Sequence, residues 1–159
     1  MDDQRQQQHA LALDLKAHAE RVEHALTQVI DGQDATEKRA LLGQALEDLV
    51  ALEALTEAHP EIQLPPLTRI RQGMASLALM LYRQGACDGL SEDQQHAFLD
   101  AHAAPLTEVD GVGTVTARRL LLAGVTSVET LRALSREQLD AIPGITNATL
   151  ARLQAGLSQ

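Results

Sequence analysis

The chain has 159 residues, of which 45% are hydrophobic and only 1% aromatic, and its formal net charge is −9. The near absence of aromatic rings argues against binding single strands by base stacking, and the single cysteine, Cys87, excludes an internal disulfide and is typical of a reducing compartment. No apolar run approaches the ~20 residues of a membrane span, and the acidic start differs from a secretory signal. We therefore expect a cytoplasmic protein that does not enter a membrane.

The charge is unevenly distributed along the chain. Residues 1–104 contain 17 acidic and 8 basic residues, whereas residues 105–159 contain five of each. Proteins that bind nucleic acid usually present a basic surface, and the N-terminal part presents the opposite. The sequence thus predicts two domains, an acidic one at 1–104 and a neutral one at 105–159.

The N-terminal domain is predicted to be helical throughout. Apolar residues recur at steps of three and four over residues 4–31, which indicates a helix with one apolar face; they are Leu11, Leu15, Ala19, Val22, Leu26 and Val29. A second helix is expected to begin at an Asp34–Glu37 cap and to run to about residue 58. A third is expected from Pro66, since proline is tolerated at the first helical position, to near residue 85.

A short fourth helix is expected from the Ser91–Gln94 capping box to just before Pro105. Three long helices joined by short loops pack most simply as an up-down-up bundle. We interpret their apolar stripes chiefly as core. Heptad-like spacing is also how helices meet between two copies, so we further expect a homodimer formed through these helices.

A short glycine-containing motif occurs twice in the C-terminal domain. Val109-Asp110-Gly111-Val112-Gly113 returns as Ile142-Pro143-Gly144-Ile145-Thr146, with an offset of 33 residues. The register extends to Leu106 and Leu139, Thr116 and Thr149, Arg119 and Arg152, and Leu120 and Leu153. In each copy an apolar residue, a tight turn, a second apolar residue and a helix form one supersecondary unit. Two such units suggest a pseudo-twofold pair that shares one core.

The physical role of the motif follows from its residue types. We expect Gly111 and Gly113 to adopt backbone angles that a side chain would penalise, which lets the chain reverse within a few residues. Val112 would point inward, and a helix would begin at about Thr114 with unsatisfied N–H groups. Outward N–H groups at a helix N-terminus form an anion site, and the usual anion is a phosphate.

Residues 106–157 therefore resemble the tandem helix-hairpin-helix family of DNA-binding modules. Similar units occur in the Holliday-junction-binding protein RuvA, the excision nuclease UvrC, bacterial DNA ligases and the C-terminal repeats of NusA. We name residues 109–113 the first hairpin and residues 142–146 the second hairpin. The first fits the family pattern, whereas the second has Thr146 in place of the second glycine and Leu150 in place of a small alanine.

The resemblance implies an all-α fold in which an N-terminal helical bundle precedes a tandem helix-hairpin-helix domain. A connector helix between the hairpins is expected to be capped by Thr126 and Glu129, and a further short helix by Ser135 and Gln138. The resemblance also implies that hairpin amides and nearby arginines contact the sugar-phosphate backbone. The predicted DNA-binding residues are Gly111, Val112, Gly113, Thr114, Arg118, Arg119, Gly144, Ile145, Thr146 and Arg152.

Catalytic and metal sites are not predicted. His96, Asp100 and His102 lie close in sequence, and Glu20 and His24 share a helix face, but neither group has a third ligand of the usual kind. We interpret the histidines as exposed and solvated. The glycines do not form a dinucleotide-binding fingerprint, and no phosphate-loop lysine or nucleophile-elbow serine is present. We expect no catalytic residue, no metal and no cofactor, and therefore no enzyme.

Two functions remain open at this point. The first is a non-catalytic accessory protein of DNA repair, recombination or replication that binds duplex or branched DNA without sequence specificity. In such a protein the acidic bundle would mediate dimerisation or bind a protein partner. The second is a protein–protein adaptor in which the helix-hairpin-helix pair is only a scaffold, which the net charge favours. Clustering of Arg118, Arg119 and Arg152 around the hairpins would favour DNA.

Overall fold

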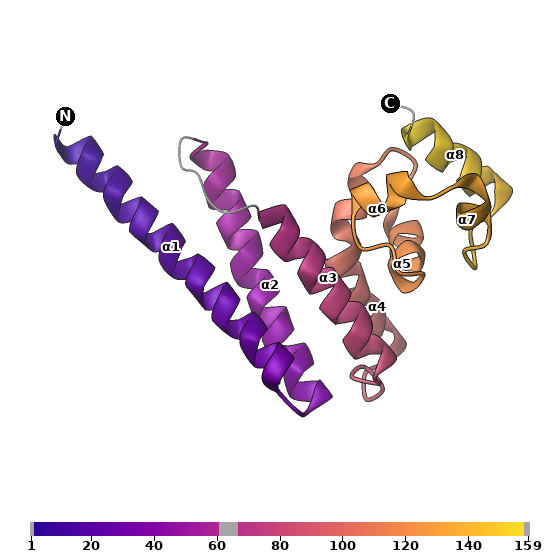
Figure 1. Ribbon diagram of the computed structural model, residues 1–159, viewed down its shortest axis with the longest axis horizontal. Helices are drawn as coiled ribbons and strands as arrows, with labels where there is room; N and C mark the ends of the chain where they lie inside the picture. The colour runs from indigo at the N-terminus through magenta and orange to yellow at the C-terminus, as the bar shows by residue number, and fades with distance from the viewer. Residues whose placement is uncertain (1, 61–66, 158–159) are drawn as a thin grey trace. The chain divides into compact units, whose positions relative to one another are not determined.

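A computed structural model describes residues 2–60 and 67–157 of the protein (Figure 1). Over these residues the chain forms eight α-helices and one 3-10 helix, and no strand. The all-α class predicted from the sequence is confirmed. The chain divides into two compact units, residues 1–71 and 72–159, and each is described by itself.

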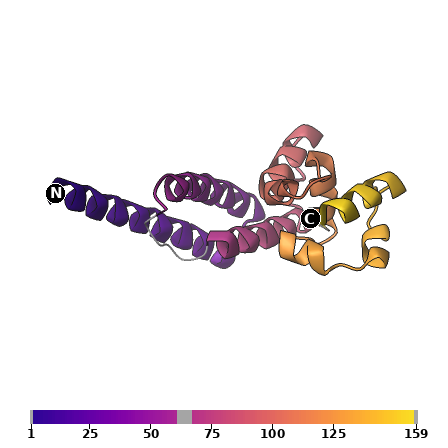
Figure 2. The same ribbon diagram turned by 90° about the horizontal axis from the view of Figure 1, so that it is seen from above.

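The first unit is dominated by an antiparallel pair of long helices. Helices α1 (Asp2–Asp31) and α2 (Ala35–Ala58) are joined by a tight turn and pack along each other (Figures 1 and 2). Asp34 caps α2, because its Oδ1 accepts the N–H of Thr36 at 3.1 Å. Both helices begin and end close to the predicted positions, since the Asp34 cap is a strong local signal for the start of α2.

The predicted apolar stripe of α1 is largely covered within this unit. Leu15, Val22 and Val29 are fully buried, whereas residues 2–10 are exposed. Arg71 of helix α3 (Leu67–Arg83) pairs with Glu53 of α2, and its Nη1 lies 2.9 and 3.0 Å from the two carboxylate oxygens. The predicted start at Pro66 lies outside the described residues. The up-down-up packing expected of the third helix stays a prediction.

The second unit contains the later part of α3 and all the elements that follow. Helix α4 (Glu92–Ala103) begins at the predicted capping box, in which Ser91 and Gln94 each bond the other's backbone. A 3-10 helix, η1 (Ala104–Glu108), continues from it to the first hairpin. Whether residues 105–159 form a domain by themselves stays a prediction, because α4 packs closely on the helix after the first hairpin.

Four further helices complete the second unit. They are α5 (Thr114–Leu122), α6 (Val128–Ala133), α7 (Arg136–Asp140) and α8 (Asn147–Leu157). Ser135 and Gln138 cap α7 as predicted. The predicted cap of α6 was wrong by one residue, since Ser127 rather than Thr126 accepts the Thr130 N–H, at 3.1 Å.

One hydrophobic core connects α3 to the C-terminal helices. Ala75 and Leu79 of α3 pack in the same cluster as residues from both hairpins. The buried members of the C-terminal part are Leu99, Ala103, Leu106, Val109, Val112, Ala117, Leu120, Leu121, Val125, Leu131, Leu139, Ile142, Ile145, Leu150 and Leu153. The core is aliphatic, as the composition requires. In the part of the chain that the structure describes, no helix has the length and apolarity needed to cross a membrane.

Candidate nucleic-acid interface

The repeat seen in the sequence is also a repeat of backbone hydrogen bonds. In the first hairpin the Val112 N–H donates to the Val109 carbonyl at 3.1 Å, and in the second the Ile145 N–H donates to the Ile142 carbonyl at 3.3 Å. All four side chains are buried, with exposed fractions of 6 to 9%. Each hairpin is therefore a closed turn fixed to the core by an apolar residue on either side.

The helix after each hairpin begins in the same register. The Ala117 N–H donates to the Gly113 carbonyl at 2.9 Å, and the Leu150 N–H donates to the Thr146 carbonyl at 2.8 Å. The donors are 33 residues apart, as are the acceptors. Leu150 is buried at the position of the small alanine, so the core accommodates the larger side chain there. The predicted 33-residue register thus holds in the structure.

Each hairpin glycine lies against the helix of the other copy. Gly111 has φ +89° and Gly144 has φ +83°, backbone angles that favour glycine. A Cβ on Gly111 would lie 2.8 Å from the Arg152 carbonyl oxygen in α8, and one on Gly144 would lie 2.7 Å from the Arg119 Nε in α5. Arg119 and Arg152 are equivalent positions, so each hairpin meets the same residue of the other copy, although by the backbone and Cβ of Arg152 and by the side chain of Arg119. This is the arrangement expected of a pseudo-twofold pair.

The expectation for Gly113 was wrong. Its φ of −88° and ψ of 179° are extended angles that any residue adopts, and a Cβ there would meet no other atom within 4 Å. Gly113 is the N-cap of α5 and offers no side-chain cap. Its lack of a side chain therefore matters for access to the helix N-terminus rather than for the turn.

The first hairpin leaves its helix N-terminus open. Thr114, Val115 and Thr116 form the first turn of α5, and their N–H groups precede the first helical hydrogen bond. Within residues 2–60 and 67–157, no side chain or carbonyl accepts a bond from these three amides. Gly113, Thr114 and Val115 are exposed. Three amides and the positive end of the helix dipole are thus available to an anion.

The second hairpin closes part of its helix N-terminus with its own side chain. The Thr146 Oγ1 accepts the N–H of Thr149 at 3.2 Å and lies 3.0 Å from the Thr149 Oγ1. Thr149 occupies the position of Thr116 in the repeat, where the N–H is open. The substitution of threonine for glycine therefore removes one of the amides that the family pattern would offer to phosphate.

The three predicted arginines have different surroundings. The Arg119 Nη1 donates to the Gly144 carbonyl at 2.7 Å and is exposed. Arg152 is exposed beside Gly111, and its guanidinium makes no hydrogen bond or ion pair with any residue that the structure describes. Two of the three arginines thus lie against the hairpins, one at each.

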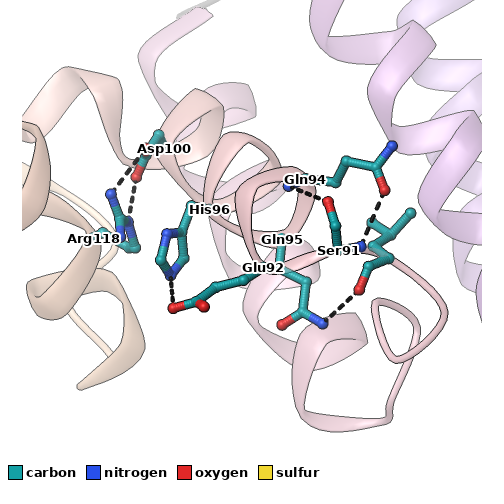
Figure 3. A network of polar contacts seen from close by, with 8 residues as sticks. Ser91, Glu92, Gln94, Gln95, His96, Asp100 and Arg118 are labelled. Atoms are coloured by element: carbon teal, nitrogen blue, oxygen red, sulfur yellow. Dashed lines mark hydrogen bonds and ion pairs between the residues drawn. The ribbon is translucent and has the colours of Figure 1, made fainter.

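Arg118 instead pairs with a carboxylate of α4. Its Nε lies 2.7 Å from Asp100 Oδ1 and its Nη2 lies 3.2 Å from Oδ2, and the two side chains are 16% and 25% exposed (Figure 3). This is a two-point pair between a guanidinium and a carboxylate. Arg118 therefore connects α5 to α4, and its predicted contact with DNA stays a prediction.

The histidines of α4 do not share one environment. The Nε2 of His96 lies 3.8 Å from the Oε1 of Glu92, and the His96 side chain is partly exposed (Figure 3). The expectation of exposed histidines was wrong for His102, which is 3% exposed. Its ring packs edge-to-face against that of Phe98, and the two ring centroids are 5.2 Å apart. Among the described residues, no three His, Cys, Asp or Glu side chains are grouped so as to hold a metal.

The first hairpin also has acidic neighbours. Glu108 and Asp110 are exposed, and they line a shallow surface hollow that Arg132 and Gly156 also border. The equivalent positions of the second hairpin are Ala141 and Pro143. The carboxylates oppose a phosphate near the first hairpin, although salt screens such repulsion beyond ~10 Å.

Two contacts at this interface were not predicted from the sequence. A Cβ on Gly156 would overlap the Asp110 carbonyl, so α8 crosses the first hairpin at a glycine. Asp100 pairs with Arg118 across 18 residues. Gly156 inside a helix was the available signal for the first contact, but it is not a specific one, because Gly43 and Gly73 also lie inside helices and an added Cβ there would meet nothing. No local pattern signals the second.

Comparison with known protein families identifies the C-terminal module. Residues 103–159 match the family model of a SAM-like helix-hairpin-helix tandem. The match confirms the predicted module and does not extend to the N-terminal helices. Neither the comparison with curated proteins nor the comparison with solved structures gave a match. A domain of this type indicates nucleic-acid binding in general.

Proposed function

We propose that the protein is a non-catalytic DNA-binding accessory protein of DNA repair, recombination or replication. Its C-terminal module binds the phosphate backbone of duplex or branched DNA without sequence specificity. No cofactor or metal takes part, and the protein acts in the cytoplasm. The acidic N-terminal helices provide a surface for a partner rather than for DNA.

One observation carries the proposal, namely the open helix N-terminus after the first hairpin. Gly113 places no side chain over the first amides of α5, and Val112 anchors the turn in the core. The backbone and Cβ of Arg152 lie against Gly111 of the same turn, and the Arg152 guanidinium has no partner among the described residues. Fixed amides at a helix N-terminus together with a nearby cation bind phosphate without requiring a base contact.

A change at Gly113 tests the proposal without harming the fold. Because the position has N-cap angles and open space, Gly113→Asp and Gly113→Asn should both cap α5 and leave the free energy of unfolding unchanged or slightly higher. Asp also places a negative charge where the phosphate would lie. We expect Asp to abolish binding to a labelled duplex in fluorescence anisotropy, and Asn to weaken it less.

The paired result separates folding from binding. Thermal unfolding of both variants serves as the control, since each should melt at or above the temperature of the parent. If the parent binds duplex, junction and single-stranded DNA and the folded Asp variant binds them equally well, the helix N-terminus is not the phosphate site and the proposal is wrong.

A second candidate function is a protein–protein adaptor. The observation that favours it is the negative charge, both in the N-terminal 104 residues and at Glu108 and Asp110 next to the first hairpin. An adaptor would show no measurable affinity for duplex, junction or single strands even at low salt. The binding experiment on the parent protein therefore distinguishes the two functions.

Self-association of the N-terminal helices is part of the proposal. The large apolar side chains that α1 and α2 leave exposed are Leu13, Ile30 and Val50, at 55, 64 and 46%. A homodimer would carry two modules and raise the avidity for one DNA molecule. Light scattering tests it, since a mass that stays near the 17.1 kDa of the monomer at micromolar concentrations would contradict a dimer.

A further inference from the structure

The two hairpins differ in how much of their polar surface is already bonded. The first hairpin has a glycine N-cap, and the backbone and Cβ of Arg152 lie against its Gly111. The Arg152 guanidinium has no partner among the described residues. In the second hairpin the Thr146 hydroxyl accepts an amide of its own helix, and the Arg119 guanidinium donates to the Gly144 carbonyl. These differences leave more unbonded donors at the first hairpin. The charge differs in the other direction, since Glu108 and Asp110 stand where the second hairpin has Ala141 and Pro143.

We infer that nucleic-acid contact is concentrated on the first hairpin and Arg152, and that Arg119 is a positioning residue that fixes the second hairpin as a support. The inference rests on the proposed function, because it divides the phosphate-binding role between two equivalent turns. Its consequence is that each module contacts the phosphates of duplex or branched DNA mainly through one hairpin.

The position of Arg119 supports a role within the protein. Its side chain lies so close to Gly144 that a Cβ there would come within 2.7–2.9 Å of Nε, Cδ and Cζ. The guanidinium therefore lies against the turn while one N–H donates to the turn carbonyl at 2.7 Å. At the first hairpin the equivalent contact is made by the backbone and Cβ of Arg152, which leaves that guanidinium free to bind an anion.

Thr146 also reduces the number of free amides at the second hairpin. In the first hairpin the equivalent residue, Gly113, has no hydroxyl, so the third amide of α5 stays open. In the second, the hydroxyl satisfies the third amide of α8 internally. An amide that already has a partner gains little from a phosphate, because binding exchanges one hydrogen bond for another.

Reciprocal substitutions test the inference in the full-length protein. Gly113→Thr gives the first hairpin the residue of the second, and Thr146→Gly gives the second the residue of the first. In fluorescence anisotropy with a labelled duplex, we expect Gly113→Thr to weaken binding by about tenfold, the loss of roughly one hydrogen bond to a charged group. Thr146→Gly should leave affinity unchanged or raise it.

The two arginines provide a readout that a purely structural role would not change. Arg152→Ala should lower the slope of log affinity against log salt by about one, because one phosphate contact is lost. Arg152→Lys should keep the slope, since the charge is retained. Arg119→Ala should leave the slope unchanged. Thermal unfolding of each variant verifies that the folded protein is being compared.

The possible results are distinguishable. Loss of slope in Arg152→Ala and of affinity in Gly113→Thr, with neither in Arg119→Ala nor Thr146→Gly, supports the inference. If the second-hairpin variants weaken binding as much as their counterparts, the inference is overturned and the proposed function stands. If the parent binds no nucleic acid at low salt, both are overturned.

Discussion

The first and second hairpins have the same backbone and different chemistry. Both close a turn with one backbone hydrogen bond, both have a glycine at positive φ, and both begin a helix in the same register. They differ at Gly113 and Thr146, and in the partners of Arg119 and Arg152. The buried residues thus give the two turns the same shape, whereas the exposed residues differ and would divide the function between the turns.

The largest expected effects test whether the two copies are equivalent in the core. Leu120 and Leu153 occupy equivalent positions and are both fully buried. Leu120→Ala and Leu153→Ala should each lower the free energy of unfolding by about 3 kcal/mol, through lost burial and a cavity. Urea denaturation measures both. A substitution that costs nothing at one of the two positions would contradict a shared core.

A pair of glycines separates backbone strain from close packing. Gly111 and Gly124 have φ of +89° and +99°, but only Gly111 faces a neighbour, the Arg152 carbonyl oxygen, at 2.8 Å from an added Cβ. Gly124→Ala should cost about 1 kcal/mol from strain alone, and Gly111→Ala about 3 kcal/mol. Equal losses in urea denaturation would show that the reciprocal contact with α8 contributes nothing.

A helical glycine tests the contact between α8 and the first hairpin. Alanine is normally favoured over glycine inside a helix by about 1 kcal/mol, and Gly73, where a Cβ meets nothing, should show that gain. Gly156→Ala should instead destabilise by about 2 kcal/mol, because its Cβ would overlap the Asp110 carbonyl. Melting temperatures that rise for both variants would contradict the close approach.

The smallest expected effects compare two adjacent arginines. Arg118→Ala breaks the pair with Asp100 and should cost about 1–2 kcal/mol, since hydrogen bonds between charged, mostly buried groups are lost. Arg119→Ala removes one exposed bond to Gly144 and should cost about 0.5 kcal/mol. Arg118→Ala combined with Asp100→Ala gives the coupling energy by a double-mutant cycle. A coupling near zero would mean that the pair is not stabilising.

Much of the fold was predictable because its signals are local. The Asp34 cap, the Ser91 and Ser135 capping boxes and the glycines of both hairpins mark helix ends by short-range hydrogen bonds and backbone angles. The 33-residue repeat predicted the register of both turns. The cap of α6 was missed by one residue because Thr126 and Ser127 are both capable of capping.

The rest depended on contacts between residues distant in sequence. The burial of His102, the Asp100–Arg118 pair and the crossing of Gly156 over Asp110 arise only when helices pack. The expectation for Gly113 was wrong for a different reason. A glycine in a turn was expected to adopt backbone angles that other residues avoid, but Gly113 has extended angles that any residue adopts. Thr146 was visible in the sequence as a departure from the family pattern, but its hydrogen bond to Thr149 was not.

The salt dependence of DNA binding by the parent protein is the most direct test of phosphate binding by the C-terminal module. Affinity for a labelled duplex is measured by fluorescence anisotropy at several salt concentrations. A module that binds phosphate through hairpin amides and one or two arginines should give a log–log slope of magnitude roughly 1–2, since each phosphate neutralised by an arginine contributes about 0.9, with affinity in the micromolar range or weaker near physiological salt. No measurable binding to duplex, junction or single-stranded DNA at low salt would show that the module does not bind phosphate.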